Sequence, residues 1–97
     1  MYKIKPYTFQ RALELGVKIL PSTNPKYKID VFDWNENYIN SIGSPSYKDF
    51  PTYIEEKGLD YALKRRKLYH KRHKREIDLL GDRWLGSRSY YAFNLLW

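Results

Sequence analysis

The stretch that decides the fold of this chain reads KRRKLYHKRHKR and runs from Lys64 to Arg75. Eight of its twelve residues are Lys or Arg, and no acidic residue interrupts them. Good helix-forming residues flank it, and neither Gly nor Pro occurs between Leu59 and Leu80. The sequence therefore predicts that this stretch is the middle of one long helix over residues 59–80.

At about 100° per residue, two kinds of side chain separate onto opposite sides of that helix. The mostly apolar side comprises Leu59, Ala62, Leu63, Tyr69, His70, His73, Ile77 and Leu80. The charged side comprises Lys64, Arg65, Lys67, Lys71, Arg72, Lys74 and Arg75, with Leu68 inside the charged arc. We expect one face to pack on a core and the other to present dense positive charge.

The composition is that of a folded domain with a basic surface. At 97 residues the chain is long enough for one modest core. A hydrophobic fraction of 42% and an aromatic fraction of 18% argue against disorder. The formal net charge is +7, and most of the excess lies in the 64–75 stretch. Such concentrated charge attracts polyanions or acidic protein surfaces.

Several classes of protein are not expected. The chain has no Cys, which excludes disulfides and thiolate metal sites. No apolar run approaches the ~20 residues that a membrane span needs. The N-terminal residues lack the apolar segment of a signal peptide.

The first half of the sequence predicts a short helix followed by strands. Thr8 is a plausible N-cap for a helix over Phe9–Leu15, which Gly16 ends. Residues 17–20 alternate briefly like a strand. Residues 28–33 and 38–42 read as a β-hairpin around the turn Trp34-Asn35-Glu36-Asn37.

The second half predicts helices. Asp49 or Phe50 caps the first, with Pro51 in its first turn, and Gly58 breaks it from the long helix. Gly81 ends the long helix, residues 84–87 form a loop, and residues 90–97 form a short helical tail. Because free termini seldom stay as apolar as Leu95-Leu96-Trp97, we expect this tail to dock, either through Phe93 and Trp97 or through Tyr91, Leu95 and Leu96.

Together these elements predict an α+β fold in a single domain over residues 1–97. A small antiparallel β-hairpin or sheet would pack against one long basic helix, with a short N-terminal helix and a docked C-terminal helical tail. Residues 1–46 would hold the short helix and the hairpin, and residues 47–97 the basic helix and the tail.

The chain resembles an uncharacterised family of small basic proteins encoded by large DNA viruses of algae and protists, and by related marine viruses. The resemblance is carried by YKDFPTYIEEKG at 47–58 and by Tyr61-Ala62 followed by KRRKLY at 64–69. It extends to KIKPYT at 3–8, KIDVFD at 28–33, SIG at 41–43, and the ending YYA…LLW at 90–97.

The chain departs from this family at two places. It has Asn35-Glu36-Asn37 where relatives often carry an Asn-Gly hairpin turn, and its segment from Ile77 to Arg88 is longer and more apolar. The resemblance implies a viral origin and no established enzymatic role, and it assigns no site residues.

The candidate binding residues lie on the basic helix. They are Lys64, Arg65, Lys67, Leu68, Lys71, Arg72, Lys74 and Arg75. Cations in this number can neutralise phosphates of nucleic acid, with Tyr61 or Tyr69 available to stack on bases. They can equally meet an acidic protein surface, which the isolated Leu68 weakly favours. The alternative is a solvated or internally paired face, although the chain has only eleven acidic residues.

Other candidate sites are weaker. His70 and His73 have a spacing that metals use, but no third ligand is evident, so we expect buried or interface imidazoles without a metal or cofactor. Trp34 is expected to fold back on the sheet, and the alternative is an exposed interface anchor. No pairing of acids, of nucleophile with His, or of glycines indicates catalysis, so an enzyme is not expected.

These features favour a viral structural or interaction protein, a minor capsid or cement-type component of the virion. Its partner would be a viral coat protein, another acidic surface or the genome, with no membrane involved. It would lie in the virion, and in the host cytoplasm or nucleus during assembly. The alternative is a nucleic-acid-binding protein of the viral core or the infected cell, and an antagonist of a host factor also stays open.

Overall fold

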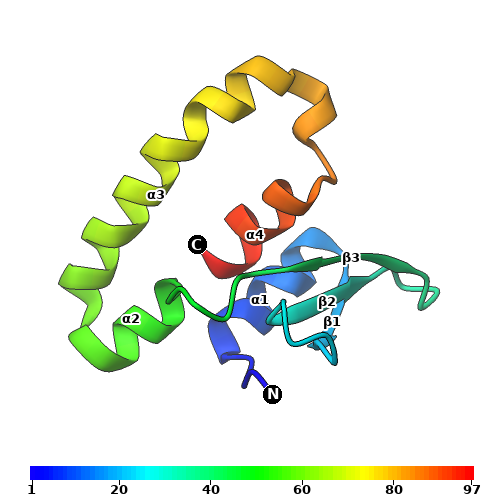
Figure 1. The fold of residues 1–97 in the computed structure, drawn as a ribbon, viewed down its shortest axis with the longest axis horizontal. Helices are drawn as coiled ribbons and strands as arrows, with labels where there is room; N and C mark the ends of the chain where they lie inside the picture. Colours follow the sequence, from blue (N-terminus) through cyan, green and yellow to red (C-terminus); the bar gives the residue numbers. More distant parts are fainter. The chain divides into compact units, whose positions relative to one another are not determined.

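A computed structural model of the chain describes all 97 residues, Met1–Trp97. It contains a three-stranded antiparallel sheet, four α-helices and one short 3-10 helix (Figure 1). In chain order the elements are α1 (Pro6–Leu15), β1 (Lys18–Pro21), β2 (Ile29–Phe32), β3 (Tyr38–Ile42), α2 (Phe50–Lys57), α3 (Leu59–Leu80), η1 (Gly81–Trp84) and α4 (Arg88–Leu96). The predicted α+β class is confirmed, as are the long helix, the short N-terminal helix and the antiparallel sheet.

The chain forms two compact units, Met1–Tyr47 and Lys48–Trp97. The first contains α1 and the sheet, and the second contains the remaining helices. The predicted division, between residues 46 and 47, lies one residue earlier. That the two parts form a single domain, with the sheet packed on the long helix, concerns both units together and stays a prediction.

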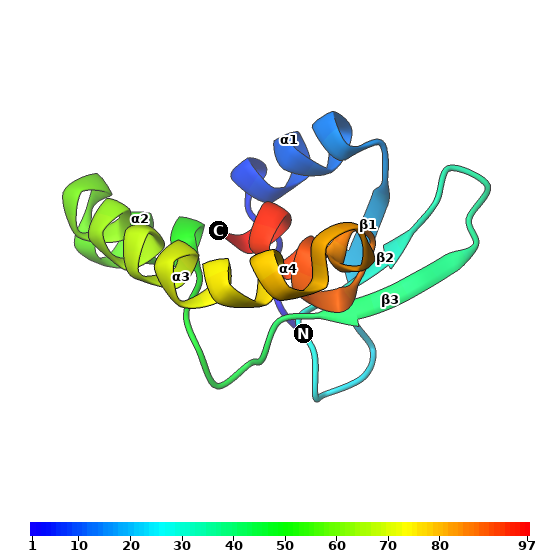
Figure 2. The ribbon, with the colours of Figure 1, turned by 90° about the horizontal axis from the view of Figure 1, so that it is seen from above.

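The sheet of the first unit has the strand order β1-β2-β3, with both pairs antiparallel (Figure 2). Ile19 pairs with Val31, and Ile29 pairs with Ile42. All four of these side chains are buried, so this face of the sheet supplies core residues. A register irregularity between Val31 and Phe32 marks the point where the hairpin begins to turn.

The hairpin turn is organised by Asp33. Its Oδ1 accepts hydrogen bonds from the backbone N–H groups of Asn35 and Asn37, and its Oδ2 accepts one from the Asn37 side chain. These bonds stabilise the carboxylate and hold the pKa of Asp33 below its ordinary value of 3.8. Glu36 has a φ of 66°, so the turn contains a left-handed residue that is not Gly. The hydrogen bonds to the Asp33 side chain therefore stabilise this turn in place of the Asn-Gly pair that is common in hairpin turns.

Helix α1 begins earlier than the sequence predicts. Lys5 is its N-cap residue, Pro6 occupies the first turn, and no side chain caps it. The prediction that Thr8 caps the helix is wrong, because Thr8 lies inside α1 and is fully buried. The reason is Pro6, whose fixed φ and missing N–H both suit a first helical position.

The second unit begins with two helices joined at a glycine. Asp49 caps α2 by accepting a hydrogen bond of 3.0 Å from the Thr52 backbone N–H, with Pro51 in the first turn. Gly58, at φ 89° and ψ 166°, separates α2 from α3. A residue with a Cβ rarely adopts this conformation, so the predicted break at Gly58 is both confirmed and explained.

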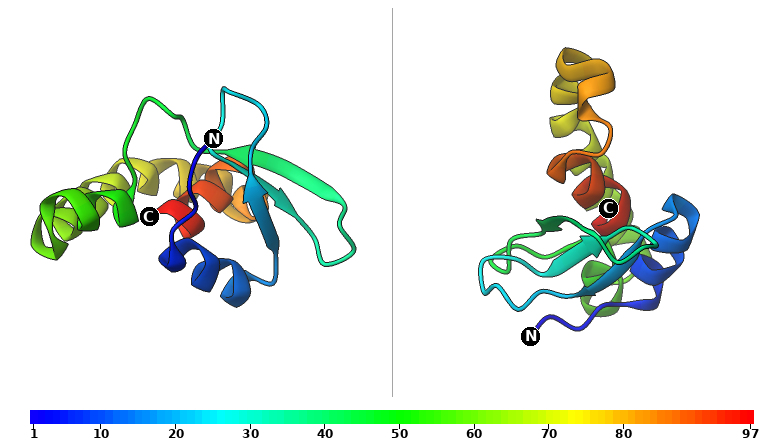
Figure 3. Two further views of the ribbon diagram at one scale, coloured as in Figure 1. Left: turned by 90° about the horizontal axis from the view of Figure 1, so that it is seen from below. Right: turned by 90° about the vertical axis from the view of Figure 1, so that its right-hand side faces the viewer.

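Helix α3 ends at Gly81, and the chain then turns back toward the middle of α3 through η1 and α4 (Figure 3). Ser87 caps α4 by accepting a hydrogen bond of 3.1 Å from the Tyr90 backbone N–H. None of the helices combines the length and the apolar character that crossing a membrane requires.

Candidate functional site

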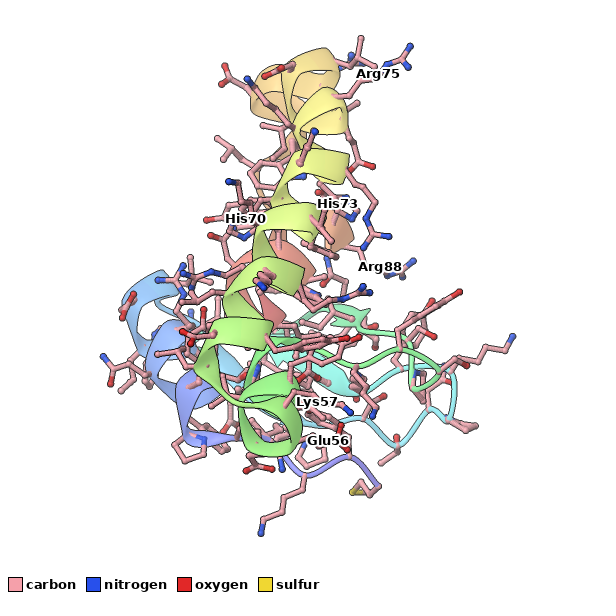
Figure 4. All side chains as sticks on the ribbon, turned by 90° about the vertical axis from the view of Figure 1, so that its left-hand side faces the viewer. Glu56, Lys57, His70, His73, Arg75 and Arg88 are labelled. Atoms are coloured by element: carbon pink, nitrogen blue, oxygen red, sulfur yellow. The ribbon has the colours of Figure 1, made fainter.

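The exposed side of α3 carries a row of cations that we call the cationic face. It consists of Lys64, Lys67, Lys71, Arg72, Lys74 and Arg75, all of them exposed. Figure 4 looks along this side of the second unit, with Arg75 projecting near the far end of α3. These six residues belong to one helix, and at 100° per residue their side chains spread over an arc of about 160° of its circumference.

The cations of this face are not neutralised within the protein. None of them forms a salt bridge in the structure. The second unit pairs a cation with a carboxylate elsewhere, where Lys48 Nζ lies 2.6 Å from Glu56 Oε2. The Glu56 carboxylate raises the pKa of Lys48, and this pair involves none of the cations of α3. The cationic face is therefore left to solvent or to a partner.

Two arginines of the same stretch have a different role. Arg65, which the sequence places among the binding residues, is half-buried, with its guanidinium carbon 5.5 Å from the centre of the Tyr53 ring. Arg66 lies in the same way over Phe50, at 4.4 Å. Such cation–π contacts contribute from about 0.5 to 2 kcal/mol, more as the cation loses water. Arg65 and Arg66 thus tie α3 to α2.

The apolar side of α3 is narrower than predicted. Ala62 is fully buried, but Leu59 and Leu63 are exposed, so the prediction that they pack on a core is wrong. The inward side of the first two turns is instead formed by Ala62 together with Arg65 and Arg66. The aromatic rings of α2 accept guanidinium groups here, which moves the buried stripe away from Leu59 and Leu63.

Further along, α3 is held by aromatic stacking against α4. The Tyr69 ring lies parallel to Trp97, at 4.5 Å and 9°, and a second close ring is that of His73, at 4.1 Å. His70 stacks on Phe93 at 4.2 Å and 21°. The predicted docking of the C-terminal tail is thus confirmed, both for Phe93 and Trp97, which stack on α3, and for Leu95 and Leu96, which are buried. Because Tyr69 is enclosed by these rings, Tyr61 is the aromatic residue of α3 that remains available to a base.

Burial in this cluster changes the acid–base properties of its members. Burial raises the pKa of Tyr69 to about 12, helped by Glu76 and opposed by Arg72. Burial also lowers the pKa of His70, as does Arg66, while a hydrogen bond to the Trp97 backbone opposes the shift. The pKa of His73 is lowered by burial and by Arg72, against Glu76. Burial and the neighbouring cations therefore favour the neutral form of both histidines.

The cationic face also contains apolar side chains. Leu68 is 51% exposed and Leu79 is 68% exposed. Tyr61 is exposed on the same side, because residues 61, 68 and 79 fall within about 20° of each other on a helical projection. Of these three, the sequence pointed to Leu68 and Tyr61, and the structure adds Leu79.

A second candidate surface, which the sequence did not predict, lies in the first unit. It is a hollow of about 630 Å³ between α1 and the sheet, which we call the apolar hollow. Its lining is Phe9, Ala12, Leu13, Val17, Lys18, Ile19, Leu20, Phe32, Trp34 and Glu36. Trp34 folds back toward β1 as predicted, with Lys18 Nζ 5.2 Å from its ring centre, but it stays 56% exposed. Phe9 and Leu13, four apart on α1, were the signal available in the sequence.

Comparison of the chain with protein-family models, with curated proteins and with solved structures gave no match. The resemblance to viral proteins therefore stays a hypothesis. The cationic face and the apolar hollow are the features from which a function can be argued.

Proposed function

We propose that this protein is a non-enzymatic structural or interaction protein of a virus particle, a minor capsid or cement-type component. In this proposal its cationic face binds an acidic surface of the coat, the genome beneath it, or both. The viral setting comes from the resemblance in the sequence, and the mode of binding comes from α3.

The observation that carries the proposal is the exposure of six cations on one helix, none of which forms a salt bridge with a carboxylate of the protein. Exposed like charges on neighbouring turns repel one another, which disfavours the isolated helix. A partner with negative charge removes that cost when it binds. The row is thus more favourable in a complex than in the free chain.

The anchoring of α3 supports a binding role for its outer side. Tyr69 and His70 hold the middle of the helix against α4, and Arg65 and Arg66 hold its first half against α2. A surface fixed before binding loses less conformational entropy when a partner docks. The contacts on the inner side of α3 therefore fix the helix in place, so that its outer side is a preformed binding surface.

The apolar residues on the cationic face favour a protein over nucleic acid as the main partner. A phosphate backbone offers no pocket for Leu68 or Leu79, whereas an acidic protein surface can offer both carboxylates and an apolar contact. The alternative function, a nucleic-acid-binding protein of the viral core or infected cell, draws on the cation density and on the exposed Tyr61.

The first test is to ask whether purified virus particles contain the chain. By mass spectrometry, a shell component will be present and will stay with the shell after the genome is released. If the chain leaves with the genome, the alternative function is favoured. If particles lack the chain altogether, the leading proposal is overturned.

The second test removes charge from the cationic face. We expect a variant with Lys64, Lys67, Lys71 and Arg72 changed to Gln to lose binding to purified shells in a sedimentation assay. Its circular dichroism should match the parent, because exposed substitutions seldom change stability by more than about 0.5 kcal/mol each. The matched control changes Lys3, Lys26, Lys57 and Arg83 to Gln. It removes the same charge from exposed positions elsewhere, and it should bind normally.

Salt dependence separates the two candidate functions. A protein that contacts six to ten phosphates loses roughly 10³–10⁵-fold in affinity for generic duplex DNA between about 50 and 200 mM salt. A shell protein should bind such DNA weakly at both concentrations while retaining its binding to shells. Tight binding to DNA with that steep dependence would favour the nucleic-acid role.

A further inference from the structure

The apolar hollow exposes a cluster of large hydrophobic side chains to solvent. Phe9, Leu13, Leu20 and Trp34 line it, and each is between 48% and 63% exposed. Single exposed apolar residues are common, but a cluster of four large ones around one hollow marks an interaction site. The volume of about 630 Å³ suits several side chains of a partner.

The charges at the rim of the hollow are of opposite sign. Lys18 and Glu36 are its only charged lining residues, and their Nζ and Oε1 atoms lie 3.7 Å apart. This distance is too long for a hydrogen bond, and the Glu36 side chain is 80% exposed. The two groups therefore pair only loosely with each other and remain available to a partner that offers one charge of each sign.

A second copy of the same chain has this arrangement of charges. In a twofold-symmetric interface, residue i of one copy meets residue j of the other, and j meets i. Lys18 of each copy would then meet Glu36 of the other. The exposed apolar side chains of each copy would pack against the hollow of the other. The first unit also has six Lys and Arg residues against four Asp and Glu, so its charge opposes association only weakly.

We propose that two copies of this chain associate through their apolar hollows, with Lys18 and Glu36 forming reciprocal ion pairs across a twofold axis. This dimer does not involve the cationic face and does not depend on the proposed function. If both hold, each dimer carries two cationic helices, and binding to a repetitive shell gains from avidity.

The charges allow a direct test with two single variants, Lys18→Glu and Glu36→Lys. In a dimer of either variant alone, like charges meet at both reciprocal contacts. We expect each to dimerise at least about tenfold more weakly than the parent in analytical ultracentrifugation. Mixed one to one, the two variants should form a heterodimer with near-parental affinity, because both contacts then join opposite charges.

A second pair of variants tests the apolar part. Leu20→Ser and Leu13→Ser each remove an exposed side chain from the hollow, so the fold should survive, as circular dichroism will check. Both should weaken the dimer. Leu85→Ser is the matched control, since Leu85 is as exposed but lies in the other unit, and it should leave the dimer unchanged.

Three results would overturn the proposal. The first is a parent protein that stays monomeric throughout the concentration series. The second is a mixture of Lys18→Glu and Glu36→Lys that associates no better than either alone. The third is a dimer that persists in Leu13→Ser and Leu20→Ser, which would place the interface on another surface. None of these measurements uses the shell or DNA, so failure here is distinct from failure of the proposed function.

Discussion

The two units of this chain are of similar size, but different kinds of contact stabilise them. The first unit buries aliphatic side chains from its strands, among them Ile29, Val31 and Ile42, all at 0% exposure. The second unit also buries aliphatic side chains, Ala62, Leu95 and Leu96, and adds to them stacked rings and guanidinium groups laid over aromatic faces. It also carries twelve Lys and Arg residues against seven Asp and Glu. Aromatic contacts suit a helix that must keep most of its circumference for charge, because few residues then provide much contact area.

The largest effect is expected from removing the ring at the centre of the second unit. We predict that Tyr69→Ala lowers the free energy of unfolding by about 3 kcal/mol, the lower end of the range for large aromatic side chains in cores. The loss follows from the contacts of the Tyr69 ring, which is stacked on Trp97 and tilted against His73. Urea denaturation followed by circular dichroism will measure it.

The control for that prediction is Tyr47→Ala in the first unit. Tyr47 is 75% exposed, so its replacement should cost no more than about 0.5 kcal/mol. If both substitutions cost the same small amount, then the second unit does not depend on aromatic stacking, and the contrast between the two units fails.

Much of the fold was predictable because its boundaries depend on local chemistry. Asp49, Gly58 and Gly81 set the ends of α2 and α3 through a side-chain cap and through left-handed backbone, which adjacent residues suffice to specify. The start of α1 was missed because two local signals competed, and Pro6 prevailed over Thr8.

The functional surfaces were only partly predictable, because they depend on contacts between elements. A helical projection gives the arc on which Arg65 lies, but not the fact that Tyr53 offers it a ring from α2. The apolar hollow likewise requires α1 and the hairpin turn to meet, which brings Leu13 and Trp34 to one place. The spacing of Phe9 and Leu13 marks an apolar side of α1, but no single segment of sequence shows which element meets it.

An intermediate effect is expected at the cap of α4, which positions the stacked rings. The Ser87 hydroxyl accepts from the Tyr90 N–H at 3.1 Å and donates to the Trp84 carbonyl at 2.6 Å. We predict that Ser87→Ala lowers the free energy of unfolding by about 1 kcal/mol. Thr23→Ala, at an exposed turn in the first unit, is the control and should be nearly neutral. An equal loss in both variants would mean that the cap contributes nothing specific.

The smallest effect is expected from pH, and it should separate the units. Both histidines of the chain lie in the second unit, and the fold holds the pKa of each below the ordinary value of 6.5. Below that pH the unfolded chain takes up protons that the folded chain resists. The contribution of the two histidines to the free energy of unfolding is therefore complete above about pH 6.5. It is lost as the pH drops through the lower, folded-state pKa values.

Thermal melts between pH 7.5 and 5, a range set by the histidine pKa, will show this decline, and a His70→Gln, His73→Gln double variant should flatten it. In the first unit, the group with a lowered pKa is Asp33, whose contribution is lost only as the pH falls below 3.8. Hydrogen exchange should therefore show amides of α3 and α4 losing protection in mild acid before those of β2 and β3. The opposite order would mean that the histidines do not control the acid response, and that the aromatic cluster tolerates their charge.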